Sequence, residues 1–89
     1  MKLILDTPQD SVTKQAVDYH IEAFILRLED NKAVLKFLKK DADGDNLGGG
    51  RIIIDGSQLD NLLNNSTSYS DMISRIYTKL QNKYPGTIS

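Results

Sequence analysis

The apolar residues near the end of the sequence repeat with the period of an α-helix, and this pattern constrains the fold more than any other. From Tyr69 to Tyr84 they recur at i, i+3, i+4 and i+7, as on an amphipathic helix that covers a core. Ser68 can cap the start of this helix, and Pro85 with Gly86 can end it. A helix with one apolar face must bury that face, so the rest of the chain has to supply a second layer.

The first half of the sequence has the patterns of β-strands. Strands are predicted at residues 2–6, 17–28, 33–38 and 51–55, where β-branched and aromatic residues are frequent. The turn-prone residues 7–11 are expected to end the first strand, because Pro8 lacks a backbone N–H. The polar turn at residues 29–32 predicts an antiparallel hairpin, and a polar, glycine-rich connection over residues 41–50 is expected to lead into the last strand.

The longest predicted strand is apolar on both sides, and its alternation shifts partway along. Strict alternation places Tyr19, Ile21, Ala23 and Ile25 on one face and Phe24, Leu26 and Leu28 on the other. A β-bulge, or burial of both faces, would explain the shift.

A short helix is predicted between the strands and the final helix. Ser57 and Asp60 have capping-box spacing, and Leu59, Leu62 and Leu63 share one side. The sequence therefore predicts an α+β fold: a small antiparallel β-meander of three to four strands, followed by a short helix and a C-terminal amphipathic helix packed on the sheet. With 89 residues, the chain is expected to form a single domain over residues 1–89.

Composition and charge make nucleic acids and membranes unexpected as binding partners of this chain. Lys and Arg number 11 against 12 for Asp and Glu, so the chain has no overall field that would attract a polyanion. The tyrosines of the last helix fall on its apolar stripe, apart from the basic residues Arg75, Lys79 and Lys83, so nucleic acid is not an expected partner. The sequence contains no apolar run long enough for a membrane span, so a membrane is not expected either.

The sequence contains no recognisable set of catalytic residues and no complete phosphate-binding loop. His20 is the only histidine, and no nucleophile or base is spaced to act with it. The run Gly48–Gly50 lacks the lysine and hydroxyl residue of a phosphate-binding loop. We therefore predict that the chain is not an enzyme and has no cofactor.

One candidate metal site lies in the glycine-rich connection. Asp41, Asp43 and Asp45 have the alternate spacing with which a calcium loop begins. Asn46 replaces the glycine of that loop, and Ile52 replaces its closing glutamate. An ordinary solvated loop explains the same residues, since Asp, Asn and Gly are common loop formers.

A protein-binding surface is the other candidate site. Tyrosine rings are common both at core edges and at interfaces, and a thin sheet covered on one side leaves apolar residues open on the other. A chain of this size also buries a modest core, which favours self-association. The predicted interface residues are Phe24, Leu26, Leu28, Tyr69, Tyr77 and Tyr84.

The layout of the chain resembles that of small, uncharacterised proteins of tailed bacteriophages. The similarity lies in the opening residues 1–8, the hairpin, the strand of residues 50–56 that runs into Leu59 and Leu62, and the terminal helix. The resemblance implies a non-enzymatic protein, located in the virion or in the host cytoplasm.

Three functions follow as hypotheses. The first is a protein-binding or structural accessory module that self-associates. The alternative is a small inhibitor of a host defence complex, of the anti-CRISPR kind, with the acidic loop as a mimic of phosphate. A further alternative is a calcium-binding module built on the three aspartates.

Overall fold

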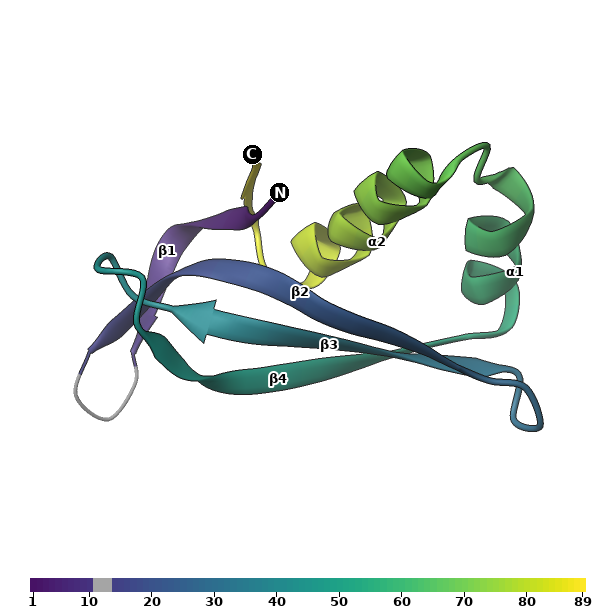
Figure 1. Ribbon diagram of the computed structural model, residues 1–89, viewed down its shortest axis with the longest axis horizontal. Coiled ribbons are helices and arrows are strands. Elements are labelled where there is room, and N and C mark those ends of the chain that lie inside the picture. The colour runs from purple at the N-terminus through teal and green to yellow at the C-terminus, as the bar shows by residue number, and fades with distance from the viewer. Residues whose placement is uncertain (11–13) are drawn as a thin grey trace.

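Five strands form one antiparallel sheet, and two helices lie over one of its faces (Figure 1). The computed structural model describes residues 1–10 and 14–89. The strand order across the sheet is β4-β3-β2-β1-β5. The elements are β1 (Leu3–Asp10), β2 (Gln15–Arg27), β3 (Lys32–Lys40), β4 (Asn46–Asp55), α1 (Gly56–Asn65), α2 (Tyr69–Lys83) and β5 (Gly86–Ile88).

The α+β fold predicted from the sequence is confirmed, with the four predicted strands and both helices in their predicted order. Two strand boundaries and the number of strands differ from the prediction. β4 begins at Asn46, inside the connection predicted to be irregular, and a fifth strand follows Pro85. β1 continues to Asp10, through most of the turn predicted at residues 7–11; Ser11 itself lies outside the described residues.

The early start of β4 depends on contact between a glycine and an aromatic ring. Gly50 lies opposite Phe37 in the β3–β4 ladder, and a Cβ atom on Gly50 would lie 2.5 Å from Cζ of that ring. The ring thus occupies the space above the glycine and supplies the packing that glycine lacks. Local composition predicts a loop here, but the neighbouring strand stabilises an extended backbone.

Pro8 interrupts the pairing of β1 without ending the strand. The register between β1 and β2 shifts between Ile4 and Gln9, so the stretch around the proline leaves the β2 ladder. On its other edge β1 pairs with β5, and the Asp6 N–H donates to the Pro85 carbonyl oxygen at 3.0 Å. A proline is tolerated where no ladder hydrogen bond requires its N–H.

A β-bulge at Glu22 accounts for the shifted alternation of β2, as one of the two sequence interpretations predicted. Ile21 pairs with Phe37 and Ala23 pairs with Lys36, so Glu22 is the extra residue. Before the bulge, Ile21 shares the helix-covered face with Phe37. After it, Phe24 pairs with Leu35 on that face, and Ala23 turns to the open face.

The core lies between the helix-covered face of the sheet and the buried sides of α1 and α2. Two buried rings of the core pack together, and a third ring at its edge joins them: the Tyr19 centroid lies 4.8 Å from that of Phe37 and 5.1 Å from that of Tyr84. Burial, with a smaller contribution from Tyr84, raises the pKa of Tyr19 above 10. The other large residues of the core include Leu3, Leu35, Ile54, Leu59, Leu62, Ile76 and Leu80.

The two helices begin differently. Ser68 caps α2 as predicted, since its Oγ accepts the Asp71 N–H at 3.1 Å. The capping box predicted at Ser57 is wrong, because α1 begins two residues earlier and Asp55, its N-cap residue, makes no side-chain capping bond. Gly56 has φ +54°, a left-handed conformation that lets the chain turn directly from β4 into α1.

Candidate functional site

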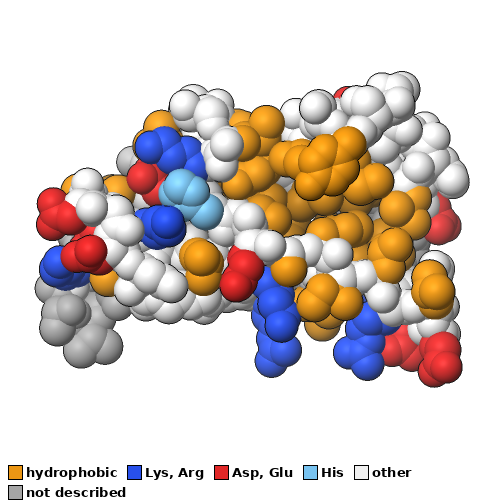
Figure 2. All heavy atoms as spheres, in the orientation of Figure 1, with side chains coloured by type: hydrophobic (Ala, Val, Ile, Leu, Met, Phe, Trp, Pro, Cys, Tyr) orange, Lys and Arg blue, Asp and Glu red, His pale blue; other side chains and the backbone are white. Residues whose placement is uncertain are grey.

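An open apolar groove of about 490 Å³ lies between β2 and α2. Figure 2 shows hydrophobic side chains gathered around this hollow in the molecular surface. Glu22 is the charged residue that borders it, among apolar and aromatic neighbours. The lining residues are Met1, Ile21, Glu22, Ala23, Phe24, Tyr69, Met72, Ile73, Ile76 and Tyr77.

The groove exists because α2 and β2 diverge. The second half of α2 is anchored in the core, where Leu80 is fully buried, whereas Tyr69 at the start of the helix is 78% exposed. In Figure 1 the first turns of α2 stand away from β2, on the side toward α1. The first half of the helix therefore forms a wall of the groove.

Tyr77 marks the inner end of the groove and holds its two sides together. Its hydroxyl accepts the Ile21 N–H at 3.0 Å and donates to the Met1 carbonyl oxygen at 2.8 Å. With 4% of its surface exposed, Tyr77 is a core residue that reaches the groove floor.

The other predicted interface residues occupy different places. Phe24 and Tyr69 meet at the groove. Leu26 and Leu28 are exposed toward the end of the β2–β3 hairpin, and Tyr84 is half-buried against the rings of the core, away from the groove. Of the six predicted residues, Phe24 and Tyr69 thus lie together on an accessible surface. Tyr77 and Tyr84 instead pack in or against the core.

The edge of β2 beside the groove has no strand neighbour in the part of the chain that the structure describes. β1 pairs with β2 only as far as Tyr19, and β3 pairs with the opposite edge of β2 from Asp18 to Arg27. The segment from Ala23 to Arg27 therefore presents backbone N–H and C=O groups toward solvent on one side. The Ile21 N–H is an exception, because Tyr77 binds it.

The open face of the sheet carries apolar residues, as expected of a thin sheet covered on one side, and three of them form a row that was not predicted. Ile25, Val34 and Ile53 are direct neighbours across β2, β3 and β4. Ile25 is 43% exposed and Ile53 is 60% exposed, so the row remains in contact with water. The alternation within residues 33–38 and 51–55 indicates that Val34 and Ile53 each lie on the face away from the core. Only the pairing of the strands shows that these two residues align with Ile25.

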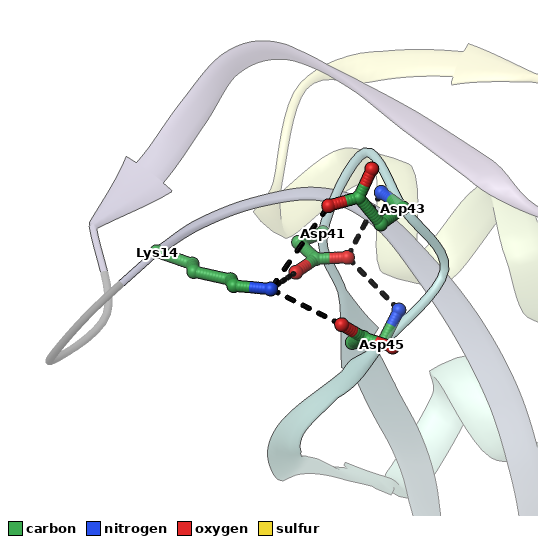
Figure 3. Close-up of polar contacts among 4 residues, drawn as sticks. All are labelled: Lys14, Asp41, Asp43 and Asp45. Atoms are coloured by element: carbon green, nitrogen blue, oxygen red, sulfur yellow. Dashed lines mark hydrogen bonds and ion pairs between the residues drawn. The ribbon is translucent and has the colours of Figure 1, made fainter.

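The three aspartates of the predicted metal site do lie together (Figure 3). Oxygen atoms of Asp41, Asp43 and Asp45 lie within 4.8 Å of one another. The ammonium group of Lys14 lies among them, 3.1 Å from Asp41 Oδ2 and 3.1 Å from Asp45 Oδ2. Asp41 Oδ1 accepts the N–H groups of Asp43 and Asp45 at 3.0 and 2.9 Å.

These contacts shift the pKa values of Asp41 and Lys14 in opposite directions. Burial by itself would raise the pKa of Asp41, which is 4% exposed, but the Asp45 N–H and the Lys14 ammonium outweigh burial and hold that pKa below 3.8. Hydrogen bonds to Asp45 and Asp41 raise the pKa of Lys14 above 10.5. The ion pairs of Lys14 thus connect the acidic loop to the residue that precedes β2, and the Lys14 ammonium lies where a bound metal ion would otherwise contact the carboxylates. No sequence pattern points to Lys14, which lies 31 residues before Asp45 along the chain.

Comparison of the chain with protein-family models, with curated proteins and with solved structures gave no match. Neither helix in the described ranges is long and apolar enough to cross a membrane.

Proposed function

We propose that the chain is a non-enzymatic protein-binding module, and that the groove between β2 and α2 is its binding surface. The observation that carries this proposal is the apolar groove beside an unpaired stretch of strand. Extended chains bind such edges by adding a strand, with their side chains in the neighbouring groove. Contiguous apolar surface of this kind marks interaction sites in soluble proteins.

The chemistry of the groove supports a protein ligand more than a small polar one. Its walls are mainly Phe24, Tyr69, Met72 and Ile73, with Glu22 at the border. Aromatic residues and methionine are the types enriched where proteins meet. An unpaired backbone edge adds hydrogen-bonding groups that a peptide backbone matches.

The biological setting follows from the layout resemblance. We propose a phage-encoded accessory protein that acts in the virion or in the host cytoplasm. Inhibition of a host defence complex through a phosphate-like acidic loop has less support, because the Lys14 ammonium compensates part of the charge of Asp41, Asp43 and Asp45. The same cation weighs against calcium binding by these residues.

Association measurements test the proposal. The mass of the purified chain is measured by light scattering over a range of concentrations, and immobilised chain is used to capture proteins from phage particles and from bacterial host lysate. Tyr69→Lys, at an exposed wall of the groove, is expected to abolish the association found. Leu63→Lys, on α1 and outside the groove lining, is the matched control and is expected to retain it.

A monomer at every concentration that captures no protein would contradict the proposed function. Equal loss of association in Tyr69→Lys and Leu63→Lys would contradict the assignment of the binding surface to the groove.

A further inference from the structure

We propose that the partner of the β2 edge is a second copy of this chain, paired antiparallel through residues 23–27 about a twofold axis beside Ile25. This inference rests on the proposed function, because it names the ligand of the same surface.

The free segment of β2 is less protected than the outer edges of the sheet. Exposed strand edges usually carry charges, prolines or bulges, or are very short. β4 carries Arg51 and Asp55 along its edge, and β5 has only three residues, next to Pro85. The β2 segment has four apolar residues in a row, from Ala23 to Leu26, whereas the longest apolar run of β4 has three, from Ile52 to Ile54. It is therefore the edge best suited to accept another strand.

A twofold axis requires each residue to pair with one on the same face of the sheet. With Ile25 opposite Ile25 of the second copy, Phe24 lies opposite Leu26 of that copy. The isoleucine pair extends the open-face row of Ile53, Val34 and Ile25 across both chains. The Phe24 and Leu26 pairs lie on the helix-covered face, beside the groove wall at Tyr69. Both faces therefore gain apolar contacts.

The charges at the two ends of the segment complement each other in an antiparallel pair. Glu22 precedes the apolar segment and Arg27 follows it. In the register centred on Ile25, Glu22 of one copy lies next to the position of Arg27 of the other. Arg27 already has an ion pair with Asp30 at 3.4 Å, but both side chains are more than half exposed, so this pair is weak and can be exchanged.

Disulfide crosslinking tests the register, and the chain has no cysteine that would interfere. Residues that face each other across antiparallel strands lie within the Cα distance that a disulfide spans. Ile25→Cys is expected to form a covalent dimer of twice 10.0 kDa under mild oxidation. Ile53→Cys, which is more exposed and lies on β4, is the control and is expected to stay uncrosslinked at the same concentration.

A charge substitution tests the same edge without covalent chemistry. Ile25→Lys is expected to convert the dimer into a monomer at concentrations where wild type is dimeric, whereas Ile53→Lys remains dimeric. Circular dichroism and amide hydrogen exchange of the β2–β3 hairpin verify that both variants are folded.

The outcomes separate this inference from the proposed function. Crosslinking of Ile53→Cys in place of Ile25→Cys, or an Ile25→Lys variant that stays dimeric, overturns the β2 pairing and leaves a protein-binding module. A wild type that is monomeric, but binds another protein that Tyr69→Lys does not bind, also overturns the β2 pairing and leaves a protein-binding module. A monomeric wild type that binds no protein overturns both.

Discussion

The hydroxyl group of Tyr77 accepts the backbone N–H of Ile21 at 3.0 Å, although 56 residues separate the two along the chain. The same hydroxyl donates to the Met1 carbonyl oxygen at 2.8 Å. One side chain of α2 therefore satisfies backbone groups of β2 and of the start of the chain, at the point where the pairing of β1 with β2 stops. This contact closes the inner end of the groove and fixes where the free edge of β2 begins.

Tyr77→Phe removes the hydroxyl and leaves both backbone groups without this partner. We expect the free energy of unfolding to fall by about 1–3 kcal/mol, the usual cost of an unsatisfied buried polar group. Urea denaturation followed by circular dichroism measures the change. Tyr69→Phe is the control, because its side chain is 78% exposed, and should change stability by less than about 0.5 kcal/mol. Equal effects of the two substitutions would contradict the structural role of the Tyr77 hydroxyl.

Ser68→Ala tests the start of α2. The substitution removes the acceptor of the Asp71 N–H, and loss of such a cap destabilises a protein by about 1 kcal/mol. Thermal unfolding should show a lower melting temperature for Ser68→Ala than for Ser70→Ala, which changes an exposed serine inside the helix. Identical melting temperatures of the two variants would count against the cap.

Gly50→Ala tests the contact that keeps β4 extended. The added Cβ would lie 2.5 Å from Cζ of Phe37, so the buried ring must shift. We expect a loss of about 1–3 kcal/mol, as for other overpacked cores, measured by urea denaturation. Arg51→Ala, at the next and exposed position of β4, should be nearly neutral. An unchanged stability of Gly50→Ala would show that Phe37 does not cover this glycine.

Acid should weaken the fold through Asp41. The pKa of Asp41 in the folded chain lies below 3.8, its ordinary value in an unfolded chain. The ionised carboxylate therefore stabilises the fold above pH 3.8, and this contribution is lost as the pH falls through the pKa of the folded chain. The unfolding free energy, measured by urea denaturation between pH 7 and pH 2, should therefore fall less steeply with acid in Asp41→Asn than in wild type. Asp43→Asn is the control, because the Asp43 side chain is 80% exposed. Asp71, whose pKa is lowered by the Thr67 N–H and by Arg75, titrates alike in all three proteins.

A calcium titration distinguishes the two interpretations of the acidic loop. We expect no heat by calorimetry and no shift in melting temperature at millimolar calcium, because the Lys14 ammonium already lies 3.1 Å from two of the carboxylates. Backbone N–H groups also occupy Asp41 Oδ1. A saturable binding isotherm would show that the ion displaces Lys14 and would restore the calcium hypothesis.

Sequence patterns predicted those parts of the fold that depend on local chemistry. The apolar stripe and Ser68 define α2, and the shifted alternation around Glu22 indicates the bulge in β2. The strand at Gly50 and the strand after Pro85 could not be predicted in this way. Each is stabilised by a neighbour distant in sequence, Phe37 for the first and β1 for the second.

The candidate site was less accessible to prediction than the fold. Helical periodicity places Tyr69 and Tyr77 on one stripe, but it cannot tell that α2 leaves the sheet at one end and enters the core at the other. The free edge of β2 depends on the register of β1, which shifts between Ile4 and Gln9, in the stretch that contains Pro8. Lys14 and the acidic loop meet only through the folding of the sheet.

The pairing of β1 with β5 has a kinetic consequence. Leu3 lies opposite Ile88, and Lys2 and Ser89 exchange two backbone hydrogen bonds of 2.8 Å, so this ladder closes a loop of nearly the whole chain. Closing a loop of that length costs more entropy than forming the neighbouring hairpins, so the ladder should be the last part of the sheet to assemble. It should also be the first to open. Because each end holds the other, the amides of Lys2 and Ser89 should have the same opening free energy in hydrogen exchange.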